Sequence, residues 1–196
     1  PSPRPPLHPR QISPRQSRQL VETAYLAAAT ALLWVAVYYL PVGGPLLRLG
    51  LPLPLALLHL RQGRRCAVEG LVVTCLLLVA LMGPIRGPLV LFPFGFQALW
   101  LGWCWQQRLS WWWSMAVGSV IGAAGFLVRV AVLSLLLGDN LWVAITTAAA
   151  GLLEKLLALV GLGITPDLGQ VQVAALLLVW LQNGMVVLAL HAVAYW

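Results

Sequence analysis

The sequence has few charged residues: Asp, Glu, Lys and Arg make up only 9% of its 196 residues, whereas 61% are hydrophobic and the mean hydropathy is +0.89. Soluble domains carry about a quarter charged residues, so this chain cannot build a water-facing surface around itself. Its apolar residues form unbroken runs instead of alternating with polar ones, which excludes a transmembrane β-barrel. The composition therefore predicts an all-α, polytopic integral membrane protein.

Signatures of catalysis and of cofactor binding are also missing. The sequence contains no glycine-rich phosphate loop followed by lysine and no GxSxG elbow. Its histidines are isolated and its three cysteines lack the short paired spacing of a metal site. We therefore expect no enzymatic activity, no cofactor, no metal and no disulfide. The residues concerned are His8, His59, His191, Cys66, Cys75 and Cys104.

Basic residues outnumber acidic ones by 12 to 5, but they lie at the ends of apolar spans and form no face interleaved with aromatic side chains. Nucleic-acid binding is therefore disfavoured, and the positive-inside rule explains the charge better. It predicts that both termini are cytoplasmic, in a bacterial or organellar inner-type membrane. The inner side would hold Arg4, Arg10, Arg15, Arg18, Arg61, Arg64, Arg65 and Arg108, and the outer side Arg48, Arg86 and Lys155.

Six spans are predicted, at about 20–40, 46–60, 68–82, 89–105, 111–138 and 171–194. The second is short and contains Gly50, Pro52 and Pro54, so we expect it to be kinked or partly unwound. The segment 141–163 also has a helical pattern, but a crossing would bury Glu154 and Lys155. We expect this helix to lie at the interface, as a lid, a re-entrant segment or a strut.

Residues 1–19 form a basic, proline-rich tail that leads directly into the first span and shows no cleavable signal peptide. Proline disfavours helix interiors, so an extended or disordered arm is expected. The arm is either a solvated tail that sets topology or a docking segment for a partner or for anionic lipid head groups.

A polar layer interrupts the apolar spans, and Arg129 lies deep within the longest of them. An intramembrane arginine is costly, so it should face protein or a water-filled cavity. The layer is either a satisfied hydrogen-bond network or an outward-open pocket in which Arg129 binds a carboxylate or phosphate bidentately. The candidate ligand-binding residues are Arg129, Gln97, Gln182, Asn183, Arg48 and Asp139.

The first span carries small residues three and four positions apart: Ala24, Ala27, Ala28 and Ala31. This spacing lets another helix approach closely, either inside the bundle or on a partner chain.

These alanines, the LPLPLALLHLRQGRR stretch, the glycine–proline joints and the six spans together resemble the S components of energy-coupling-factor transporters. More closely, they resemble an uncharacterised family of predicted membrane proteins grouped with those components. The resemblance implies that the AxxxA pairs, Ala24 with Ala28 and Ala27 with Ala31, dock on a T-type transmembrane subunit. It also implies a vitamin- or metal-sized ligand bound near the outer face, with ATP hydrolysed by a separate ATPase pair.

Two hypotheses follow from the sequence. The first is a substrate-capture subunit of an energy-coupling-factor-type importer, which requires an outward cavity containing Arg129. The second is a non-transporting accessory or assembly subunit of a larger membrane complex, docked through residues 1–19, which requires a filled bundle interior. Under both hypotheses the chain is embedded in a membrane and contacts lipid.

Overall fold

The computed structural model describes residues 13–40, 44–159, 161 and 166–194, and within these ranges the chain forms only helices and their connections. This confirms the all-α prediction. The elements are α1 (Pro14–Tyr39), α2 (Gly44–Gly50), α3 (Leu53–Gln62), α4 (Arg64–Met82), the 3₁₀ turn η1 (Pro88–Leu91), α5 (Phe94–Gln106), α6 (Trp111–Leu137), α7 (Leu141–Leu159) and α8 (Leu168–Ala194).

Six stretches of the described chain are long and apolar enough to cross a membrane, in agreement with the predicted number. Their membership differs from the prediction at one place. The predicted span at 46–60 is not among them, whereas α7 meets the requirements of length and hydropathy. The stretches are α1, α4, Pro88–Gln106, α6, α7 and α8.

The expected kink in the second span is present as a complete break between α2 and α3. Pro52 and Pro54 have no backbone N–H to donate, so the helix cannot continue through them from α2. The chain restarts where the Ala56 N–H donates to the Pro52 carbonyl over 3.0 Å. Neither α2, with 7 residues, nor α3, with 10, is long enough to span a bilayer core alone.

The first helix begins before the predicted start of the first span, because α1 starts at Pro14. The Ser13 hydroxyl accepts from the Gln16 N–H, and the Gln16 side chain accepts from the Ser13 N–H, which forms a capping box. Proline at the first helical position is compatible with a helix start. The prediction of an extended arm is thus wrong for residues 14–19; residues 1–12 lie outside the described part.

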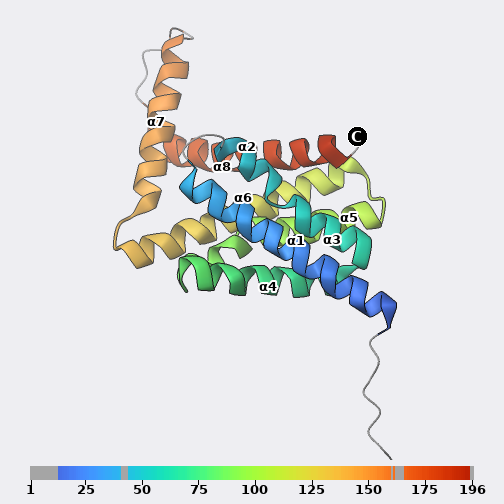
Figure 1. Ribbon diagram of the computed structural model, residues 1–196. Helices are drawn as coiled ribbons and strands as arrows, with labels where there is room; N and C mark the ends of the chain where they lie inside the picture. Colours follow the sequence, from blue (N-terminus) through green and yellow to red (C-terminus); the bar gives the residue numbers. More distant parts are fainter. Residues whose placement is uncertain (1–12, 41–43, 160, 162–165, 195–196) are drawn as a thin grey trace, which may run out of the picture.

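The long helices α1, α4 and α6 run in similar directions, so their first turns lie at the same end of the bundle (Figure 1). We call this the basic end, defined by the start of α1, the α3–α4 junction and the α5–α6 junction. The opposite, far end holds α2, the 83–87 turn and residues 138–140. Within the described chain, the basic residues that the sequence assigns to one side of the membrane therefore lie at one end of the folded bundle. Which side of the membrane each end faces stays a prediction. The basic end carries Arg15, Arg18, Arg61, Arg64, Arg65 and Arg108.

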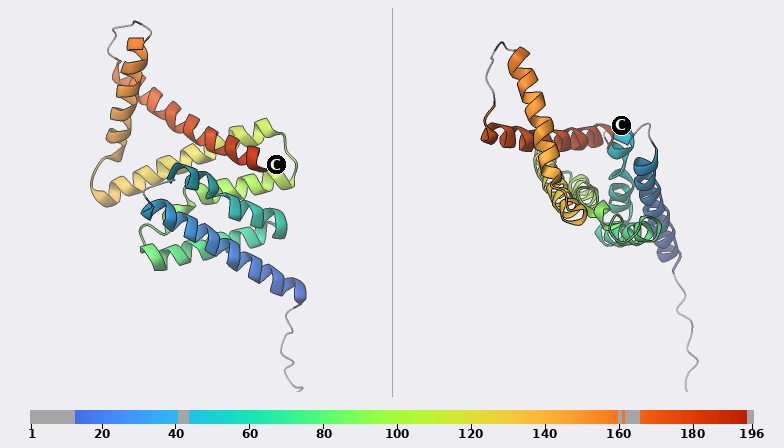
Figure 2. Two further views of the ribbon diagram at one scale, coloured as in Figure 1. Left: turned by 45° about the horizontal axis from the view of Figure 1, so that its top comes forward. Right: turned by 90° about the vertical axis from the view of Figure 1, so that its left-hand side faces the viewer.

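α6, α7 and α8 form a triangle in which α6 and α8 converge at the basic end and α7 joins their separated far ends (Figure 2). α7 runs across the direction of the bundle, which is how a helix lying at the interface would run if the other long helices cross the bilayer. Its length also permits a crossing. The interfacial location of this helix stays a prediction.

The convergence of α6 and α8 has a local cause in small residues on α6. A Cβ added at Gly118 would lie 3.3 Å from Val187, and one added at Gly122 would lie 2.7 Å from the Asn183 Oδ1 atom. Closer to the basic end, the buried His191 ring places Nε2 3.1 Å from the Ser114 hydroxyl. The two helices are therefore in close contact along this half and separate toward the far end.

Candidate functional site

A cavity of about 530 Å³ opens in the far half of the bundle, between α2, the start of α5, α6 and α8. It lies where α6 and α8 separate, beyond the contacts made by Gly122. Its volume suits a small organic ligand. Four of the six residues predicted to bind ligand line it: Arg48, Arg129, Gln182 and Asn183. The remaining lining is apolar and consists of Leu49, Pro93, Phe94, Phe126, Val130, Leu133, Met185 and Val186.

Arg129 is held in position by two aromatic residues of α1. Its Nη2 donates to the Tyr38 hydroxyl over 2.7 Å, and its guanidinium carbon lies 5.2 Å from the centre of the Trp34 ring and 5.9 Å from that of Tyr38. A guanidinium over an aromatic face is attracted to the ring quadrupole. These contacts fix the side chain without neutralising its charge.

No acidic side chain lines this cavity, and the salt bridges within the described residues join other pairs: Arg18 with Glu22, and Arg65 with Glu69. Arg48 and Arg129 therefore bring two positive charges to one apolar-walled space. A guanidinium without an acidic partner, in a helix long and apolar enough to cross a membrane, is suited to binding an anion.

Gln97 and Asp139 do not line the cavity. Gln97 is fully buried behind its wall, where its Nε2 donates to the Gly118 carbonyl over 3.3 Å and its Oε1 has no partner among the described residues. A Cβ added at Gly122 would lie 2.7 Å from both the Gln97 Nε2 and the Asn183 Oδ1 atoms, so the two amides meet at this glycine. Asp139 is exposed in the link between α6 and α7.

Several residues at the candidate site were not predicted from the sequence. Trp34 and Tyr38 orient Arg129 from a helix distant in sequence, and no local pattern indicates that contact. Phe126 and Leu133 could have been identified, because positions three and four apart from Arg129 share a helix face with it. Val130, the neighbour of Arg129 in the sequence, could not be identified by this rule.

The alanines of the first span divide between two faces of α1. Ala27 and Ala31 are 0% and 2% exposed and pack inside the bundle, where the Thr74 hydroxyl donates to the Ala27 carbonyl over 3.2 Å. The expectation that this pair meets a partner is therefore wrong for the folded chain. Ala24 is exposed and Ala28 is half-buried, so this pair stays accessible.

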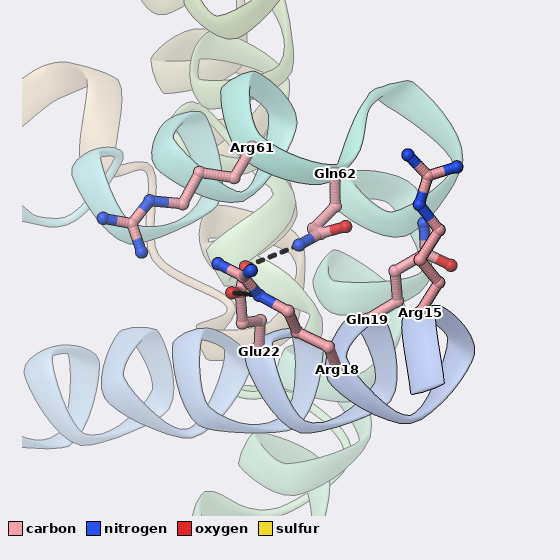
Figure 3. Close-up of a pocket in the computed structure, with 6 residues that line it drawn as sticks. All are labelled: Arg15, Arg18, Gln19, Glu22, Arg61 and Gln62. Carbon is pink, nitrogen blue, oxygen red and sulfur yellow. Dashed lines mark hydrogen bonds and ion pairs between the residues drawn. The ribbon is translucent and has the colours of Figure 1, made fainter. Parts of the chain in front are cut away.

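A second cavity, of about 450 Å³, lies at the basic end between α1 and α3 (Figure 3). Glu22 accepts from the Arg18 Nε over 2.8 Å and from the Gln62 Nε2 over 2.6 Å. The side chains of Arg15 and Arg61 point away from each other on opposite sides of Glu22 (Figure 3). Because the guanidinium groups do not converge, this region ties α1 to α3 and does not form a single anion site.

The three thiols are free, and no group of three or more potential metal ligands occurs in the described parts of the chain. The candidate site is thus a cavity with two cationic side chains, two amides and otherwise apolar walls, and no nucleophile–base pair lines it.

The helical bundle, its apolar spans and the cavity within it define the class of this molecule as a polytopic α-helical membrane protein. Within that class, the chain belongs to the family described as "Predicted membrane protein (DUF2232)", whose model matches residues 28–189. No curated protein and no solved structure matches the chain.

Proposed function

We propose that this protein is the substrate-capture subunit of an energy-coupling-factor-type importer and that its substrate is a small organic anion. The observation that carries the proposal is the pair Arg48 and Arg129, which line one cavity of about 530 Å³ without a carboxylate beside them. The resemblance of the spans to S components supplies the transporter class.

The cavity favours a ligand with an anionic group and an apolar body. Tyr38 occupies only Nη2 of Arg129, and a guanidinium has five N–H donors, so donors remain for a carboxylate or phosphate. Gln182 adds an amide at the same cavity. Phe94 and Phe126 offer aromatic surface for the rest of a vitamin-sized molecule.

The same proposal assigns a partner to α1. Ala24 and Ala28 lie one turn apart on its accessible face, and small residues at this spacing allow a helix of a T-type transmembrane subunit to approach closely. ATP hydrolysis would belong to a partner ATPase pair, and this chain would perform no covalent chemistry.

The accessory-subunit hypothesis requires a filled interior and docking through residues 1–19. The cavity at Arg129 favours substrate capture over that alternative.

Ligand binding is tested by thermal unfolding of the purified full chain against a panel of vitamins and of small carboxylates and phosphates. A ligand present at 100 times its dissociation constant stabilises the folded state by about 2.7 kcal/mol. We expect at least one anion to stabilise the wild type and to lose this effect with Arg129→Gln. Arg86→Gln is the matched control, because Arg86 is exposed at the same end and does not line the cavity. A stabilising anion that is equally effective with Arg129→Gln would exclude the site.

Partner docking is tested separately, by gentle detergent purification from native membranes and identification of the co-purifying chains. We expect a T-type subunit with two ATPases, and loss of both with Ala24→Trp or Ala28→Trp but not with Arg129→Gln. Recovery of a different complex without an ATPase would exclude the importer assignment while leaving the ligand cavity open to test.

A further inference from the structure

A third cavity, of about 480 Å³, lies on the outside of the bundle where α3, α4, α5 and α6 meet. It is distinct from the Arg129 cavity and shares no lining residue with it. One end is polar, with His59 from the last turns of α3 and Arg64 from the first turn of α4. The rest is apolar and aromatic, and includes Val68, Leu99, Phe96 and Trp103.

The position of each residue along its helix gives the groove a direction. Arg64 begins α4 at the basic end, and Trp103 lies in the last turn of α5, at the same end. Phe96 lies seven residues earlier in α5, so the apolar part runs about 10 Å from the basic end toward the middle of the bundle. Val68, Phe96 and Trp103 are exposed on the outer surface.

His59, at the polar end, is 1% exposed. Neither of its ring nitrogens makes a hydrogen bond of good geometry within the described residues, although the Gln106 side chain lies nearby. The ring is fixed by close packing: a Cβ added at Gly102 would lie 2.5 Å from the His59 Cβ. A buried polar group without a partner is costly, so an oxygen-bearing ligand at this end would stabilise it.

Arg64 differs from its neighbour in the same turn. Arg65 pairs with Glu69, with its Nε 3.0 Å from the Glu69 Oε1, and does not line this groove. Arg64 forms no salt bridge within the described chain and does line it. The groove therefore combines one available guanidinium, a buried imidazole and an apolar channel leading toward the membrane interior.

We propose that this groove is a specific binding site for one anionic phospholipid. The phosphate lies against Arg64 at the basic end, with an ester or glycerol oxygen near His59. One acyl chain follows Val68, Leu99 and Phe96 toward the middle of the bundle. The charge of Arg64 complements the phosphate, and the exposed apolar side chains of Val68 and Phe96 offer a surface for the part of an acyl chain next to the head group. This proposal does not rest on the importer assignment.

The test is native mass spectrometry of the full chain, released from detergent under conditions that strip loosely bound lipid. Phosphatidylglycerol and phosphatidylcholine are titrated in turn, and glycerol 3-phosphate is added as a competitor without acyl chains. We expect one retained phosphatidylglycerol on the wild type and weaker retention of phosphatidylcholine. Glycerol 3-phosphate should not displace the lipid.

Three variants locate the site. Arg64→Gln should weaken phosphatidylglycerol binding about tenfold, since it removes a charge-assisted hydrogen bond. The matched control Arg65→Gln should bind as the wild type does. Val68→Trp fills the apolar part from an exposed position and should reduce binding of both lipids.

Equal binding by the Arg64→Gln and Arg65→Gln variants would overturn the proposal in favour of non-specific annular lipid. Displacement by glycerol 3-phosphate, with Val68→Trp behaving as wild type, would overturn it in favour of a soluble phosphate ligand.

Discussion

Gly125 on α6 offers a sharp test of how the wall of the Arg129 cavity is built. A Cβ added there would lie 2.7 Å from the Cα of Pro93 and 2.9 Å from its Cβ, well inside the 3.4 Å at which ordinary contact begins. Pro93 is buried and its backbone cannot rotate away as a flexible side chain would. Gly125→Ala therefore forces α6 away from the start of α5.

The expected magnitude follows from two opposing effects. Overpacking a close contact costs about 1–3 kcal/mol, whereas replacing glycine by alanine inside a helix stabilises the helix by about 1 kcal/mol. Gly151→Ala isolates the second effect, because nothing lies within 4 Å of a Cβ added at that position in α7. The two variants should differ in unfolding free energy by about 1–3 kcal/mol, with Gly125→Ala the less stable.

Thermal unfolding in detergent measures this difference, and each kcal/mol corresponds to about 2–4 °C in Tm for a chain of this size. Because Pro93 lines the cavity, Gly125→Ala should also weaken binding of any anion identified by the ligand panel. Equal Tm values for the Gly125→Ala and Gly151→Ala variants would refute the close approach of α6 to Pro93.

Three further predictions concern the ends and the helices of the bundle. Ser13→Ala removes the cap of α1 and should lower the free energy of opening its first turn by about 1 kcal/mol, which is measured as faster amide hydrogen exchange in that turn. Tyr38→Phe removes the hydrogen bond to Arg129 and should lower the unfolding free energy by about 1 kcal/mol. The control Tyr39→Phe, at a more exposed ring, should leave the unfolding free energy unchanged, and equal losses in the two variants would contradict the contact. Ser110 and Asp139 flank the two ends of α6. Single cysteines at these positions, Ser110→Cys and Asp139→Cys, each in a chain without native cysteines, should react with an impermeant maleimide from opposite sides of the membrane. Labelling of both from the same side would show that α6 does not cross.

Much of the candidate site could be predicted from single residues. Arg129, Gln182 and Arg48 are conspicuous because a polar group within an apolar span needs a protein or aqueous environment. Gln97 has the same character in the sequence, yet it lies behind the wall, since helix rotation decides whether a polar side chain meets a cavity or a neighbouring carbonyl. Asp139 was predicted at the site because it directly follows a span, but its position in the sequence does not show whether the loop points toward the cavity or away from it.

The alanines of α1 show why spacing alone is insufficient. Ala24 with Ala28 and Ala27 with Ala31 have identical spacing, but the two pairs occupy different faces of the helix. Which face is accessible depends on where α4 packs, and that is a property of the assembled bundle.

The residue pattern alone was enough to predict an all-α membrane protein with most of its arginines on one side and a second apolar segment that is kinked or partly unwound. The hydropathy of a segment, the positions of its prolines and the positions of its arginines depend only on neighbouring residues in the sequence. They can therefore be evaluated without knowledge of the fold. Three features required the folded arrangement to be known: α6 and α8 separate beyond Gly122, Arg48 and Arg129 share one cavity, and α7 runs across the far end. These features depend on contacts between helices distant in sequence, whose packing the local pattern of residues does not specify.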